Sequence, residues 1–380
     1  MIRKMMVLWI ILAGIACSSM VLAETLTVGY LTGGASPFGA VAESQGLFIK
    51  EGLTVKLVPF SSSPDALNAL NSGKLDIAAG FGTAPPLIFI GKGADFVVIA
   101  GHMTGGHAIV GTPEFARKYK NIRSFIGKTV VSPRLITPDV ILKGALNHAG
   151  ITYGTDGNVQ VRIVETKNGP QALQVLKSGK VDAAALVHTE VELARQAGYK
   201  VLAWSIDIFP EHPCCRVVVK RDFLKNHSET LTAFLRAWIQ AERVREYDRK
   251  AYVEAYARQG NFSNKKADEI LYEPHVSHSA DPNTLAVIKM WDYLRNIDYI
   301  QSTADIRKNI NTSLYKTALD QLAKQNPQDK FYKKLEARFR KFNPPGKALA
   351  QAVPGQGEYV LPNAAPLPVM AAVGDERHCH

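Results

Sequence analysis

An internal repeat is the sequence feature that most constrains the fold. Residues 64–79 read PDALNALNSGKLDIAA and residues 170–185 read PQALQVLKSGKVDAAA, with ten of sixteen positions identical at an offset of 106 residues. This offset is far longer than the period of about 20–50 residues that marks solenoids. It predicts two similarly built α/β units, each with its own sheet. Two chance instances of a helix–glycine–strand unit would share the apolar positions, but they explain the common Ser-Gly-Lys-x-Asp less well.

Strand-like and helix-like segments alternate around both copies of the repeat. The expected strands are apolar, at residues 25–30, 54–60, 128–132 and 159–166. Each precedes a step into a helix, at Ser36-Pro37, Ser63-Pro64, Thr137-Pro138 and Gly169-Pro170. A Ser or Thr hydroxyl can cap the free N–H groups of a helix, and Pro suits its first position. Thr83 and Thr189, which follow the two repeat copies, are expected to cap the next helices. The alternation predicts mainly parallel sheets.

The pattern changes after about residue 209, where helices dominate. Apolar periodicity predicts helices at residues 228–247, 281–295, 305–322 and 330–342. The last 37 residues, from Pro344, contain six prolines and little periodicity, and we expect them to be mostly disordered.

The N-terminus has the three parts of a secretory signal peptide. Arg3 and Lys4 precede a 12-residue apolar run, and the sequence around Ala23 fits a cleavage site that leaves Glu24 first. The run is shorter than the roughly 20 apolar residues that span a bilayer. Lipidation at Cys17 is a less favoured alternative. We therefore expect residues 1–23 to be removed and the protein to be exported to the periplasm.

The charge and the cysteines exclude some classes of protein. The formal net charge is +11, but Lys and Arg are spread along the chain without a basic arm or nucleic-acid motif. We expect no nucleic-acid partner, and at most an attraction to anionic solutes or lipids. The four cysteines do not make a disulfide framework. No nucleophile elbow, zinc motif, P-loop or dinucleotide fingerprint is present.

Two motifs carry a resemblance to a known family. Residues 43–60 read ESQGLFIKEGLTVKLVPF, and residues 66–76 follow with a Ser-Gly-Lys-x-Asp step. Together they resemble the nitrate/sulfonate/taurine family of periplasmic substrate-binding proteins, over about residues 24–322. The resemblance implies the solute-binding component of an ABC importer that captures a small, anionic solute. It implies a monomer that docks on permease subunits, with no cofactor and no enzymatic activity.

The resemblance also implies a two-lobed, type 2 periplasmic-binding-protein fold of class α/β. Two mixed, mainly parallel sheets flanked by helices would enclose a ligand cleft. The expected boundaries are lobe 1 at residues 24–109 and 207–322, lobe 2 at residues 110–206, a C-terminal helix at residues 323–343 and the tail at residues 344–380.

Loops at strand ends supply the candidate ligand-binding residues. In such sheets ligands lie beside helix N-termini, whose free N–H groups bind anions. Arg134 could pair with an anionic group or face solvent, and His188 could donate to an anion or lie at a solvated helix start. The candidates are Gly33, Gly34, Ser36, Gly82, Thr83, Ser132, Arg134, Thr137, His188, Thr189, Glu190, His212, Cys214, Cys215 and Arg216.

The adjacent cysteines Cys214 and Cys215 are the least ordinary feature of the candidate site. An oxidising compartment favours a disulfide between them, which is the expectation. Alternatively, they remain thiols and bind a soft metal with His212, or they are simply two small buried residues. His275-x-x-His278 and His378-Cys379-His380 are not assigned as metal sites.

Two rival functions share much of this pattern. One is a pyrimidine-precursor synthase, which carries a longer cysteine cluster than this chain has. The other is the binding subunit of a membrane sensor, which would have the same fold and ligand chemistry.

Overall fold

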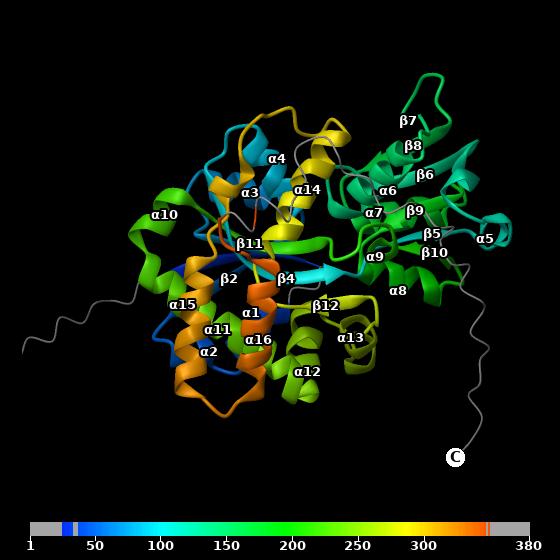
Figure 1. Cartoon of the computed structure of the whole chain (residues 1–380). Coiled ribbons are helices and arrows are strands. Elements are labelled where there is room, and N and C mark those ends of the chain that lie inside the picture. The colour runs from blue at the N-terminus through cyan, green and yellow to red at the C-terminus, as the bar shows by residue number, and fades with distance from the viewer. Residues whose placement is uncertain (1–24, 33–36, 347–348, 350–380) are drawn as a thin grey trace, which may run out of the picture.

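The computed structural model describes residues 25–32, 37–346 and 349, which form an α/β molecule with two sheets (Figure 1). The expected signal peptide and most of the expected tail lie outside the described residues. Among those residues, no helix is long and apolar enough to cross a membrane.

The first sheet has six strands in the order β12-β4-β11-β3-β1-β2. They are β1 (Thr25–Leu31), β2 (Thr54–Phe60), β3 (Ile77–Gly82), β4 (Phe96–Gly105), β11 (Pro213–Lys220) and β12 (Val276–His278). Strand β1 is parallel to β2 and β3, whereas β11 is antiparallel to β3 and β4. A strand from late in the chain therefore lies in the middle of the first sheet.

The second sheet repeats this arrangement, with the order β10-β5-β9-β6-β8-β7. Its strands are β5 (Ala108–Gly111), β6 (Lys128–Pro133), β7 (Tyr153–Gly154), β8 (Val161–Thr166), β9 (Ala183–Leu186) and β10 (Lys200–Trp204). Strand β6 is parallel to β8 and β9, and β5 is antiparallel to β9 and β10. The expectation of two similarly built α/β sheets is confirmed.

The repeated aspartate explains why both sheets carry the same motif. Asp76 Oδ2 accepts hydrogen bonds from the backbone N–H of Thr27 (2.7 Å) and from its hydroxyl (2.6 Å). Asp182 Oδ2 accepts one from the backbone N–H of Thr129 (2.9 Å). In each unit the aspartate at the start of one strand thus ties it to the neighbouring parallel strand. The glycines of the motif have φ of 72° and 71°, a conformation that glycine adopts most readily.

Helices cover both faces of each sheet. Those of the first unit are α1 (Pro37–Ser44), α2 (Leu47–Lys50), α3 (Ser63–Asn71), α4 (Ala84–Gly91), α10 (Arg221–Asn226), α11 (Ser228–Tyr247), α12 (Arg249–Gly260), α13 (Asn264–Leu271), α14 (Thr284–Asn296), α15 (Ser313–Gln325) and α16 (Lys330–Phe342), with a 3₁₀ turn at Ile306–Asn309. Those of the second unit are α5 (Pro113–Lys118), α6 (Thr137–His148), α7 (Gly169–Lys177), α8 (His188–Gln196) and α9 (Ser205–Ile208), with a 3₁₀ turn at Ile122–Phe125.

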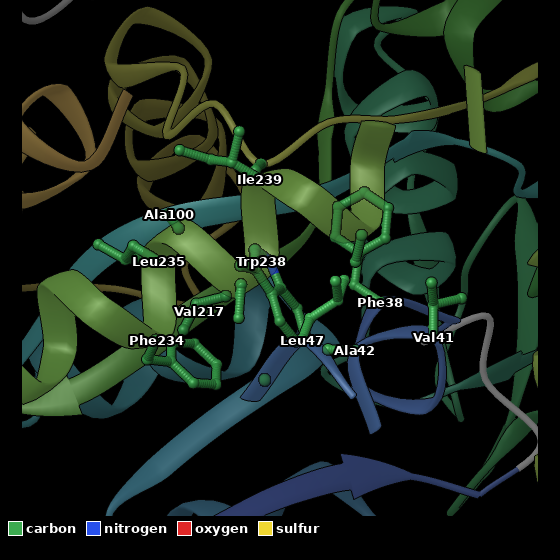
Figure 2. Packing of buried hydrophobic residues seen from close by; sticks show 14 of the residues in the cluster. Phe38, Val41, Ala42, Leu47, Ala100, Val217, Phe234, Leu235, Trp238 and Ile239 are labelled. Atoms are coloured by element: carbon green, nitrogen blue, oxygen red, sulfur yellow. The ribbon is translucent and has the colours of Figure 1, made fainter. Parts of the chain in front are cut away.

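The core of the first unit has two layers, one on each face of its sheet. Helices α3, α4 and α14 pack on one face, and α1, α11, α12 and α15 pack on the other (Figure 1). Trp238 of α11 lies at the centre of the second layer, between Phe38 and Phe234 at ring distances of 5.4 and 5.2 Å (Figure 2). Its indole N–H donates to the carbonyl oxygen of Gly101 (3.0 Å), which fixes α11 to β4.

Several expected helix caps are wrong by one or two residues. The cap of α3 is Ser62 rather than Ser63, and the cap of α7 is Asn168. Thr137 and Thr189 lie inside their helices. The physical reason is that the N–H groups of the whole first turn lack intrahelical partners, so Pro fits more than one position there.

The chain passes between the units twice. It leaves β4 through Gly105 and Gly106, whose φ angles are 77° and 81°, and returns through α9 into β11. A Cβ on Gly105 would lie 2.1 Å from the carbonyl oxygen of His275, so only glycine fits at this crossing. The two crossings place the ends of β4 and β11 beside the strand ends of the second unit.

Candidate functional site

A cavity of about 160 Å³ lies between the two units. The first unit contributes Leu31, Thr32, residues 61–63, Gly80 and Gly82 to the cavity wall. The second unit contributes residues 136–138, residues 167–170, Val187, His188 and Glu190. The segments near the two crossings contribute Met103, His107, Cys214 and Cys215. The first residues of α3, α6, α7 and α8 are all among them. Four helix starts therefore border one cavity, and the free N–H groups of helix starts favour an anionic group.

Six of the candidate residues line this cavity: Gly82, Thr137, His188, Glu190, Cys214 and Cys215. Six others do not: Thr83, Ser132, Arg134, Thr189, His212 and Arg216. Gly33, Gly34 and Ser36 lie outside the described residues. The roles of all of these residues in binding stay predictions.

Thr83 occupies the N-cap position of α4, as expected, but its hydroxyl makes no cap hydrogen bond to the helix. Its backbone N–H and its hydroxyl both donate to the carbonyl oxygen of Cys214, at 2.7 and 3.2 Å. A Cβ on neighbouring Gly82 would lie 3.1 Å from the hydroxyl oxygen of Thr137 in the second unit. A small residue at position 82 thus lets the two units approach each other beside the cavity.

Neither arginine among the candidates lines the cavity. Arg216 is buried, and its guanidinium donates to the carbonyl oxygens of Cys215 (2.7 Å) and Met103 (3.3 Å), which leaves it beneath the cavity wall. Burial lowers its pKa to about 10. Arg134 is largely exposed and lies 3.3 Å from a carboxylate oxygen of Glu165.

A bulge in β11 turns both cysteines toward the cavity. Adjacent residues of a regular strand face opposite sides of the sheet. Here the pairing of β11 with β4 shifts between Pro213 and Cys215, so Cys214 is an extra residue. Such bulges re-aim side chains.

Both cysteines are free thiols, with their sulfur atoms 3.2 Å apart. The expected disulfide between them is wrong. Cys214 Sγ instead lies 3.1 Å from Nε2 of His107. Burial raises the pKa of the Cys214 thiol well above its usual value, so the thiol keeps its proton at neutral pH.

Two buried histidines, His107 and His188, line the cavity, and a third, His212, lies next to His107. Burial lowers the pKa of His188 and of His212 to about 3, and it lowers the pKa of His107 well below 6.5. All three are therefore neutral at pH 7. His212 lies behind the cavity wall with its ring 5.7 Å from that of His107.

His107 and Met103 were missed by the sequence reasoning, as were Lys167 and the serines at 61–63. The Gly105-Gly106 pair before His107 could have revealed the first crossing. Within the described ranges, no three or more His, Cys, Asp or Glu side chains are arranged to hold a metal ion. His275 stacks on Trp204 at 4.2 Å, while His278 packs among aromatic rings.

Comparisons with known proteins add the family and the fold. A model of the NMT1-like family matches residues 23–258. The taurine-binding periplasmic protein of Escherichia coli strain K12 is 29% identical over 225 residues, which cover 58% of this chain and 66% of that protein. The nitrate import ATP-binding protein NrtC of Synechococcus elongatus is 27% identical over 229 residues, 57% of this chain and 35% of that protein. The matched region thus spans about two thirds and about one third of these relatives.

A solved structure shows the same fold. The aliphatic sulphonate binding protein SsuA of Escherichia coli aligns with a TM-score of 0.63 at 20% identity, over 77% of this chain and 99% of that one. The expected periplasmic-binding-protein fold, with two mixed sheets flanked by helices, is confirmed. The resemblance to the nitrate, sulfonate and taurine binding proteins is confirmed as well. Because the model of the NMT1-like family matches more than half of the chain, the protein belongs to this family.

Proposed function

We propose that the protein is the extracytoplasmic solute-binding component of an ABC importer. The observation that carries this proposal is the cavity of about 160 Å³ whose walls come from both units. Its volume is close to that of a cavity of about 150 Å³ that accommodates one benzene molecule, so it suits a ligand of that size. The taurine-binding relative supports the proposal, and the sulphonate-binding structure shares its fold.

Binding would act by closure of the two units around the solute. A ligand held by both walls is bound more tightly in the closed state, so it shifts the population toward that state. The helix starts of α3 in the first unit and of α6, α7 and α8 in the second would hold an anionic group from both sides. Lys167 is the cationic side chain among the lining residues that the structure describes.

The proposed partners are a small solute and the permease subunits of the importer. The proposed location is the periplasm, after removal of residues 1–23, with lipid anchoring at Cys17 less favoured. We propose a monomer. The lobe boundaries predicted from the sequence remain part of the proposal; the boundary at 109/110 falls within β5 and the one at 206/207 within α9.

A binding role is preferred to catalysis. A thiol beside an imidazole can act as a nucleophile and base, and Cys214 with His107 has this composition. However, a reactive cysteine is a thiolate with a lowered pKa, whereas burial raises the pKa of Cys214. The pyrimidine-synthase alternative therefore gains no support here. The sensor alternative has the same cavity, and only a partner protein would distinguish it.

Calorimetric titration of the purified protein with nitrate, ethanesulfonate and taurine, with thermal unfolding scans beside it, tests the proposal. A solute at about 100 times its Kd stabilises the protein by about 3 kcal/mol. The exposed Ser61 lines the cavity, so S61W is expected to abolish binding while the fold survives. The matched control S178W, at an exposed position outside the lining, is expected to bind normally. Failure of a broad panel of small solutes to stabilise the wild type would contradict the proposal.

A further inference from the structure

Glu190 lines the cavity, and one of its two carboxyl oxygens has no partner among the described residues. It is the third residue of α8, and the residue is 4% exposed. Within the described part of the chain, its Oε2 atom has no hydrogen-bond partner. Buried polar groups are nearly always hydrogen-bonded, so each exception needs an explanation. A ligand group that completes the bond is the explanation that the position in the cavity favours.

The neighbouring helix keeps the carboxyl group in place. A Cβ on Gly169, at the start of α7, would lie 2.9 Å from the carboxyl carbon of Glu190 and 3.0 Å from Oε2. The carboxyl group therefore occupies space that is open only because residue 169 is glycine. The same Cβ would lie 3.1 Å from a methyl carbon of Val187. Glu190 is thus held at the cavity wall by packing.

No cation of the described residues neutralises this carboxyl group. His188 on the same helix and His107 at the crossing are neutral because burial lowers their pKa values. Tyr256 of α12, which faces Glu190, is a neutral phenol because burial raises its pKa. Lys167 lines the cavity but forms no ion pair with Glu190. Burial raises the pKa of Glu190 to about 8, as expected for a carboxyl group without a charged partner.

We infer that Glu190 selects a ligand that carries a cationic hydrogen-bond donor, such as a primary ammonium group, and binds that group through its free carboxyl oxygen. The inference rests on the proposed solute-binding function and names the chemistry of its ligand. The ligand has two ends, because the helix starts in the same cavity present N–H donors for an acceptor or anionic group. On binding, the carboxyl group gives up its proton to solvent and becomes the carboxylate that pairs with the ligand cation.

Two probes of equal length separate the two ends of the ligand. Taurine carries an ammonium group and a sulfonate, whereas isethionate carries a hydroxyl group and the same sulfonate. Calorimetry of the wild type is expected to show taurine binding at least 10-fold more tightly. In E190Q, taurine affinity is expected to fall at least 10-fold and isethionate affinity to change less than threefold. The amide of Gln can still donate to an acceptor, but it cannot neutralise an ammonium group.

Proton release provides a readout that a merely structural role would not change. Titration at pH 7 in buffers with different ionisation enthalpies is expected to show release of a proton when taurine binds the wild type, and none when it binds E190Q. The control E192Q changes a carboxyl group on the same helix outside the cavity lining, and it is expected to bind both probes like the wild type. Circular dichroism of each variant checks that it is folded.

Equal affinity for both probes, or equal losses for both in E190Q, would overturn the inference and leave the proposed function standing. If the wild type binds neither taurine nor isethionate, thermal unfolding scans with small amines and with amine-free anions test which class of solute the protein binds. A hit confined to amine-free anions overturns the inference alone, and a hit among amines that E190Q loses supports it. The absence of any hit overturns the proposed function together with the inference.

Discussion

The sulfur of Cys214 lies 3.1 Å from Nε2 of His107, and this contact joins the two segments along which the chain crosses between its units. His107 follows the glycine pair of the first crossing, and Cys214 is the extra residue of the bulge at the second. Both side chains line the cavity. The contact therefore links the two crossings directly to the candidate binding site.

We expect Cys214 and Cys215 to be reduced but slow to react. Both are buried, and burial raises the pKa of Cys214, so little thiolate is available for alkylation. In a variant with Cys17 and Cys379 replaced by Ser, a maleimide reagent is expected to label fewer than one thiol per molecule within minutes in the native state. After unfolding without reductant it should label two. If no thiol is labelled after unfolding, Cys214 and Cys215 form a disulfide and this prediction is wrong.

Acid is expected to destabilise the protein steeply below about pH 6. Burial lowers the pKa of His102, His188 and His212 to about 3, whereas an unfolded histidine has a pKa near 6.5. Between these values the unfolded state binds more protons than the folded state. Each histidine should therefore lower the free energy of unfolding by up to about 1.4 kcal/mol per pH unit as the pH falls. The raised pKa values of Glu190 (about 8) and Glu242 (about 7) act in the opposite direction and offset part of this loss. Urea unfolding from pH 7 to pH 4 measures this slope.

The variant H102F tests one member of this group. Phe keeps a ring in the aromatic cluster with Phe38 and Trp238 but cannot bind a proton. In H102F, the free energy of unfolding is expected to depend less steeply on pH, by the contribution of one proton. The control H148Q, at an exposed position, should keep the wild-type slope. A slope unchanged in H102F would mean that His102 does not titrate differently in the two states.

Lys143 is expected to contribute strongly to stability. Its ammonium group lies 3.0 Å from Asp139 and 3.0 Å from Glu165, and both Lys143 and Asp139 are buried. K143M would leave the Asp139 carboxylate buried without its cation, which costs about 3–5 kcal/mol. The control K118M removes an exposed lysine paired with Glu114 and should change the free energy of unfolding by less than about 1 kcal/mol. If urea titration shows that K143M and K118M lower the free energy of unfolding equally, Lys143 and Asp139 do not form a stabilising buried pair.

The two copies of the repeated aspartate should have similar effects. Asp76 and Asp182 both accept a hydrogen bond from the backbone N–H of a threonine on the neighbouring strand. D76A and D182A are each expected to lower the free energy of unfolding by about 2 kcal/mol, because hydrogen bonds to charged groups are lost. The control D156A, at an exposed position, should have little effect. If only one repeat variant is destabilised, the two positions are not structurally equivalent.

Much of the fold was predictable because its signals are local or periodic. Helix α11 begins at Ser228 and ends at Tyr247, as expected from the spacing of its apolar residues, and α16 has the expected bounds. The repeat predicted two similar sheets, since residues such as Asp76 and Asp182 serve the same local contact in each. Cap positions were less predictable, because Ser62 and Ser63 are both adequate caps and only packing of the helix chooses between them.

The candidate site was predictable only in part. Glu190, His188 and Thr137 were found because cavity-lining residues gather at helix starts, and a helix start has a sequence signature. Arg134 and Arg216 were chosen for their charge, yet one faces solvent and the other lies under the wall. The direction of a side chain depends on the surrounding strands, which come from distant parts of the chain.

The sequence by itself determined the class of fold and the family, because periodicity, the repeat and the helix-start steps are properties of short segments. The tertiary structure alone decided which side chains face one another. Cys214 meets His107 across 107 positions of the chain, and a bulge in the pairing of β11 with β4 turns it that way. Likewise, Glu190 is left without a cation only because folding buries it against Gly169, and burial changes the electrostatics of a carboxyl group in a way that no local pattern records.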